Sequence, residues 1–107
     1  MKASFGSLAL AFLAAVSAGC QSNLKSAPPV TASFIRAGLR EHADGPTLAE
    51  GRKVFLSRCI ACHALPEINR YEPARIPRIV GWMSGRAHLS AGQKEALTKY
   101  LLTVRSQ

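Results

Sequence analysis

The feature that most constrains this sequence is how little of it can build a hydrophobic core. Regular helical patterning is confined to residues 47–107 of a 107-residue chain. A domain of about 60 residues buries only about 60% of the surface of its unfolded chain, and it is marginally stable without a disulfide, a metal or a bound group. The sequence therefore excludes large enzymes and doubly wound sheets. It also requires something besides apolar side chains to stabilise the fold.

Residues 1–19 have the layout of an export signal. Lys2 precedes an apolar run over residues 5–18, and small residues follow that run. The run is shorter than the roughly 20 residues that a helix needs to cross a bilayer. We therefore interpret residues 1–19 as a signal peptide.

The end of this segment, Ser17-Ala18-Gly19-Cys20, resembles the cleavage site of bacterial lipoproteins. The resemblance implies cleavage before Cys20 and acylation of its thiol, which would anchor the protein on the periplasmic side of a bacterial membrane. By the same resemblance, Gln21 favours the outer membrane. The alternative is an ordinary secretory signal with an incidental cysteine.

Residues 20–46 are rich in Ser, Ala, Pro and Gly. Consecutive prolines at 28 and 29 block regular helix and favour an extended spacer. We expect residues 20–46 to be a flexible tether between the anchor and a domain over residues 47–107. Within the tether, residues 34–39 could form a short helix that packs on the domain.

The motif Cys59-Ile60-Ala61-Cys62-His63 has the spacing C-x-x-C-H. Side chains three residues apart on a helical turn share a face, so Cys59 and Cys62 can form thioethers to the two vinyl groups at one edge of a haem. The imidazole of His63 can then reach the iron as a neutral nitrogen ligand. The motif predicts one covalently attached haem c.

Three other uses of the cysteine pair fit less well. A zinc site needs more ligands, and the sequence has no second cysteine pair, while His42 and His88 lack ligand spacing. A thioredoxin-like pair needs a βαβ context, which this pattern does not have. A disulfide between helical positions i and i+3 is rare. Export also agrees with haem, because bacteria attach haem covalently outside the cytoplasm.

The segments around the motif resemble those of a small cytochrome c. The stretch Leu48-Ala49-Glu50-Gly51-Arg52-Lys53-Val54-Phe55 is similar to the family's first helix, and Leu97-Thr98-Lys99-Tyr100-Leu101 to its last. The resemblance implies an all-α, minimal cytochrome c fold with about three helices around one haem. We expect those helices over residues 47–62, 76–84 and 90–104.

The residues themselves predict the first and last of these helices. Thr47 and Ser90 each precede a Glu or Gln by three residues, which is the capping-box pattern, and apolar residues then recur at steps of three and four. Gly51 inside the first helix costs about 0.5–1 kcal/mol. By resemblance to the family, we expect Gly51 to let the two helices cross closely against Tyr100.

The sixth iron ligand decides the chemistry of such a site. Met83 precedes the last helix, where it resembles the family's axial methionine, and a His/Met pair raises the reduction potential and suits electron transfer. His88 is the competing ligand, and a Met83 that only fills the core is the third possibility. Arg75, Arg78 and Trp82 are the candidate contacts of the haem propionates.

The charge balance bears on the partners. The formal net charge of +8 favours redox proteins with acidic docking surfaces over nucleic acid, which an exported protein rarely meets. No nucleophile–base pair is visible, so we expect a monomeric, membrane-tethered monohaem electron carrier and not an enzyme. The alternatives are a haem-based sensor or ligand-binding protein and a peroxidase-like protein, both with an open sixth iron position.

Overall fold

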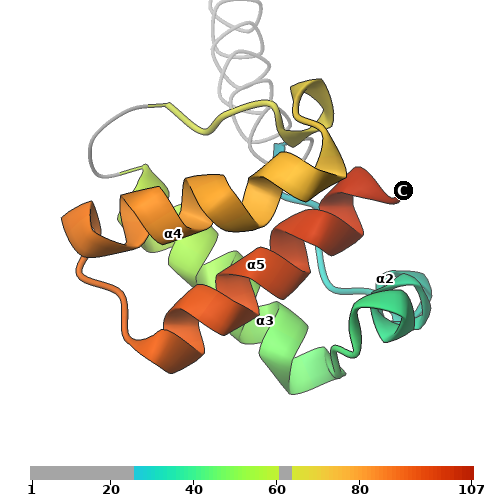
Figure 1. Ribbon diagram of the computed structural model, residues 1–107. Coiled ribbons are helices and arrows are strands. Elements are labelled where there is room, and N and C mark those ends of the chain that lie inside the picture. Colours follow the sequence, from blue (N-terminus) through green and yellow to red (C-terminus); the bar gives the residue numbers. More distant parts are fainter. Residues whose placement is uncertain (1–25, 61–63) are drawn as a thin grey trace, which may run out of the picture.

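The computed structural model describes residues 26–60 and 64–107, and in these ranges every regular element is a helix (Figure 1). The all-α prediction is confirmed for this part of the chain. Cys20, Cys62, His63 and the predicted signal segment 1–19 lie outside the described residues.

The α-helices are α2 (Ala32–Gly38), α3 (Gly45–Val54), α4 (Ile76–Arg86) and α5 (Ala91–Arg105). Single 3₁₀ turns lie at Leu39–Glu41, Ile68–Arg70 and Pro73–Arg75, and a π-helical turn, Phe55–Cys59, extends α3.

Helix α5 is the central element of the fold. It packs on α2, α3 and α4, and its most extensive interface is with α3, which crosses it in Figure 1. The hydrophobic core lies along these interfaces, with contributions from all four helices. Its larger members are Phe34, Leu48, Val54, Phe55, Ile76, Val80, Leu97, Tyr100, Leu101 and Val104.

The predicted start of α4 at Ile76 and the predicted capping box of Ser90 and Gln93 are confirmed, and α5 begins at Ala91. Before α5, the Ser90 hydroxyl accepts a hydrogen bond from the Gln93 N–H at 3.1 Å, and the Gln93 side-chain oxygen accepts one from the Ser90 N–H at 3.0 Å. This capping box satisfies two backbone donors that the helix leaves unpaired. Helix α5 then runs one residue past the predicted end, and α4 two residues past its own.

The predicted start of the first helix at Thr47 is wrong, because α3 begins at Gly45. Its N-cap is Asp44, whose carboxylate accepts a hydrogen bond from the Thr47 N–H at 2.8 Å. This hydrogen bond lowers the pKa of the exposed Asp44 carboxyl. Pro46 lies in the first turn, where its missing N–H costs nothing and its fixed φ suits the helix.

The end of the same helix also differs from the prediction. The α-helix ends at Val54, and the π-helical turn replaces it up to Cys59. The Ser57 hydroxyl donates to the Lys53 carbonyl at 2.7 Å, a back-bond that weakens regular α-helix. A π turn pairs residues five apart, so the face defined by a 3.6-residue period does not extend unchanged from α3 to Cys59.

The close crossing of the first and last helices at Gly51 is confirmed. Gly51 is buried, and a Cβ at this position would lie 2.5 Å from the Cβ of Tyr100 and closer still to the carbonyl oxygen of Ala96. Backbone atoms cannot yield to such a contact. The interface between α3 and α5 therefore depends on the missing side chain.

The prediction of a flexible tether is wrong for its described part, residues 26–46. Helix α2 brings Phe34 into the core, where it is 2% exposed and its ring centroid is 5.4 Å from that of Tyr100. The Tyr100 hydroxyl donates to the Pro28 carbonyl at 2.8 Å, and the Arg52 Nε donates to the same carbonyl at 3.2 Å. Residues from Ala27 onward thus belong to the folded domain. The short helix predicted at 34–39 corresponds to the end of α2, which stops at Gly38, and to Leu39, which begins the following 3₁₀ turn.

We predict that Gly51→Ala destabilises the protein by about 3 kcal/mol, the upper end of the cost of overpacking a core. The physical reason is the collision with the Ala96 backbone. Gly92→Ala in α5 is the matched control, because nothing lies within 4 Å of its added Cβ and alanine stabilises a helix by up to about 1 kcal/mol relative to glycine. Urea unfolding checks both variants, and equal effects would contradict the crossing.

We also predict that stability falls as the pH rises from about 10 to about 12. Burial raises the pKa of Tyr100 from 10.0 to about 12, so the folded state favours the neutral phenol and loses that advantage across this window. Tyr100→Phe removes the hydrogen bond to the Pro28 carbonyl, so it should lower the free energy of unfolding by about 1 kcal/mol at neutral pH. The stability of this variant should also fall less than that of the parent between pH values of about 10 and 12. If the stability of Tyr100→Phe falls with alkaline pH as steeply as that of the parent, this role of Tyr100 is refuted.

Candidate functional site

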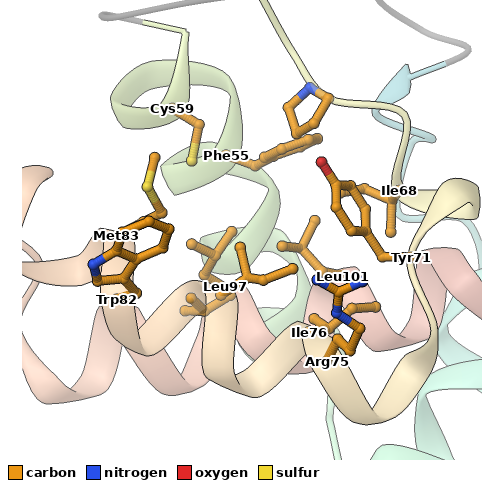
Figure 2. A pocket seen from close by; sticks show the side chains of 13 residues that line it. Phe55, Cys59, Ile68, Tyr71, Arg75, Ile76, Trp82, Met83, Leu97 and Leu101 are labelled. Atoms are coloured by element: carbon orange, nitrogen blue, oxygen red, sulfur yellow. The ribbon is translucent and has the colours of Figure 1, made fainter.

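A cavity of about 330 Å³ lies between α4, α5, the π-helical turn after α3 and the segment that leads into α4. Figure 2 shows its lining side chains. Apart from Arg75, they are apolar, aromatic or sulfur-containing. They are Phe55, Cys59, Pro66, Ile68, Tyr71, Arg75, Ile76, Ile79, Val80, Trp82, Met83, Leu97 and Leu101.

Helix α4 forms one wall of the cavity because of its apolar period. Ile76, Ile79, Val80 and Met83 are spaced at three, four and seven residues, so they share one face. Ile76 and Val80 are also buried in the core, each 3% exposed. The same stripe therefore packs the helix on the core and lines the cavity.

The opposite wall carries Cys59. This residue ends the π-helical turn, its thiol is free and half-buried, and burial raises the pKa of the thiol. The other two members of the C-x-x-C-H motif, Cys62 and His63, lie outside the described residues. The structure thus brings the first cysteine of the motif to the cavity.

Met83 lies at the same cavity. It extends from α4, and Figure 2 shows its side chain directed toward that of Cys59. His88, the competing ligand in the sequence, is exposed in the turn between α4 and α5 with a left-handed φ of 54° and does not line the cavity. His42 is likewise exposed, after the 3₁₀ turn that follows α2. Of these candidates, the structure brings only Met83 to Cys59.

The candidate propionate contacts separate into two groups. Arg75 and Trp82 line the cavity, and Arg75 is the one cation among the lining side chains that the structure describes. Arg78 is exposed and does not line it. Trp82 is 70% exposed, so it stands at the rim with most of its ring in solvent.

Sequence reasoning missed how residues 64–75 close the cavity. Ile68 is 6% exposed and lines the cavity, although it is an isolated apolar residue without a periodic neighbour. The carbonyl of Tyr71 accepts a hydrogen bond from the Arg105 Nε at 2.9 Å, which fixes this segment to the end of α5. The only signal for this path was Leu65 before Pro66, which indicated extended chain.

Two features are absent from residues 26–60 and 64–107. No group of three or more His, Cys, Asp or Glu side chains in these ranges is arranged to hold a metal ion. None of the helices there has the length and apolar character needed to cross a membrane.

Comparison with known proteins adds no assignment. A scan against models of protein families found no match, and neither did searches of curated proteins and of solved structures. The features of this chain that bear on function are therefore the motif and the cavity. Their common element is Cys59, the motif residue that the structure describes at the cavity wall.

Proposed function

We propose that this protein is a monohaem c-type cytochrome that carries single electrons between redox partners. The observation that carries the proposal is that Cys59, the first cysteine of the C-x-x-C-H motif, borders an apolar cavity that Met83 also lines. The full C-x-x-C-H motif is the attachment sequence of c-type haem. Met83 would add a thioether, and a histidine paired with a methionine on the iron is typical of electron-transfer cytochromes.

The residues around the cavity suit a haem. Cys59 and Cys62 would hold it covalently, and His63 and Met83 would be its iron ligands. Leu97 and Leu101, both buried, give the cavity an apolar floor. When bound, the haem iron supplies a one-electron couple whose potential such surroundings raise. An apolar group in this cavity would also add the buried surface that a small domain lacks.

The two propionate carboxylates of a haem would need a cationic partner in the cavity lining. Arg75 is the cation available there. A guanidinium can pair with a carboxylate through two hydrogen bonds. We therefore propose Arg75 as the propionate partner and Trp82 as a contact at the rim. Arg78 is not proposed for this role, because it does not line the cavity.

The position of Met83 bears on the alternative functions. A sensor or peroxidase-like protein needs an open sixth position on its iron. A half-buried thioether at the cavity favours a closed position, and hence an electron carrier, over both alternatives. His88 would require its turn to move toward the cavity before it could act as a ligand.

The membrane anchor remains part of the proposal, with a shorter tether. Acylated Cys20 would be separated from Ala27, which is fully buried, by a stretch of chain that spans at most about 25 Å when extended. The domain would then stay close to the lipid surface. Partners in the same membrane would be favoured over those that diffuse far from it.

We predict that Met83→Ala lowers the reduction potential by on the order of 0.1 V, a fraction of the roughly 0.8 V over which axial ligands set haem potentials. The variant should also lose the weak far-red absorption of the oxidised protein that reports a thioether on the iron. His88→Ala is the matched control and should keep both properties. Spectroelectrochemistry measures them together. If His88→Ala changes the potential and Met83→Ala does not, the ligand assignment is wrong.

A further inference from the structure

Helix α4 presents a row of three side chains to solvent on the face away from the core. Arg78, Trp82 and Arg86 are each four residues apart, so they lie on one face of the helix, and all three are exposed. Buried Ile76 and Val80 occupy the other side. We refer to Arg78, Trp82 and Arg86 as the Arg–Trp–Arg stripe.

Trp82 is unusually exposed for a tryptophan. At 70% exposure it is the most exposed of the large hydrophobic side chains in the described ranges. The guanidinium carbon of Arg86 lies 5.2 Å from its ring centroid, within the range of a cation–π interaction. Because this contact restrains the ring, less entropy would be lost when a partner covers it. Exposed tryptophan and arginine are the residues that most often dominate protein interfaces.

The stripe is also uniformly positive. The sequence of α4, IPRIVGWMSGR, contains no acidic residue, and Arg75 directly precedes it. The ion pairs found in residues 26–60 and 64–107 join Glu67 with Arg70 and Glu95 with Lys99, so neither involves the stripe. Its guanidinium groups are therefore available to carboxylates of another molecule, which they bind in a fixed fork geometry.

A protein surface fits the stripe better than a lipid surface. An interfacial helix enters a membrane with a broad apolar face. In α4 that face is already committed to the core and the cavity, through Ile76, Ile79 and Val80. Only Trp82 remains for lipid, whereas one aromatic ring between two cations matches a protein surface with carboxylates around an apolar patch.

We propose that the Arg–Trp–Arg stripe is the docking surface for a protein partner with an acidic face. That the partner is a redox protein rests on the proposed function. Trp82 connects the two proposals structurally, because it lines the cavity and is exposed on the stripe. A partner docked there would therefore approach the cavity at its rim.

The test measures binding of the full-length, membrane-extracted protein to two immobilised polymers, poly-glutamate and a glutamate–tyrosine copolymer. Replacing both stripe arginines (Arg78→Gln with Arg86→Gln) should weaken binding to both polymers on the order of tenfold at low salt. Trp82→Ala should weaken binding to the copolymer by about 3- to 10-fold and leave binding to poly-glutamate nearly unchanged. Added salt should weaken all of these interactions.

The matched control removes the same charge elsewhere. Arg36 and Arg40 are exposed on α2 and the turn after it, so Arg36→Gln with Arg40→Gln should change binding less than twofold, a shift expected only from the lower net charge. Equal losses in both double variants would mean that the net charge acts without a defined surface, and would overturn the proposal.

A second arm uses vesicles that contain phosphatidylglycerol. If the stripe variants lose binding to these vesicles but keep binding to both polymers, the stripe is a membrane contact and the proposal is wrong. Haem content and unfolding midpoint are recorded for every sample. Stripe-dependent binding by a protein without haem would support the docking surface while refuting the electron carrier, so the two failures are distinguishable.

Discussion

The close contact between α3 and α5 at Gly51 is the interaction on which the rest of this structure depends. Because no side chain separates Gly51 from Ala96 and Tyr100, the two helices approach closely enough to share one core. The same crossing orients Tyr100, whose ring contacts Phe34 and whose hydroxyl holds the Pro28 carbonyl. One glycine thus determines both the helix packing and the attachment of the N-terminal segment.

Helix α4 divides its surface between two roles. Its apolar stripe closes a cavity beside Cys59, and its opposite face exposes arginines and a tryptophan. If the cavity holds haem, as we propose, the same helix would supply an iron ligand through Met83 and a docking surface through Arg78, Trp82 and Arg86. Such an arrangement would keep the distance between cofactor and partner short without further structure, which suits a domain of this size.

Local patterns predicted the helices, and long-range contacts account for the differences. The reciprocal bonds of Ser90 and Gln93 depend only on neighbouring residues, so the start of α5 could be read from the sequence. The Thr47 pattern was misleading because Asp44 offers a competing cap three residues earlier. The composition of residues 26–46 indicated a flexible tether, because the contact that buries Phe34 is with Tyr100, 66 positions later in the chain. The path of residues 64–75 similarly depends on Arg105, and no local pattern encodes it.

The proposed function requires that haem is attached covalently, and the intact mass of the mature protein after denaturation is the decisive measurement. The protein should be isolated from a host that assembles c-type cytochromes, beside a variant with Cys59→Ala and Cys62→Ala. We expect the parent to retain the added mass of one haem in denaturant and the double variant to lack it. A parent chain whose mass equals that of its polypeptide and any lipid alone would rule out a covalent haem.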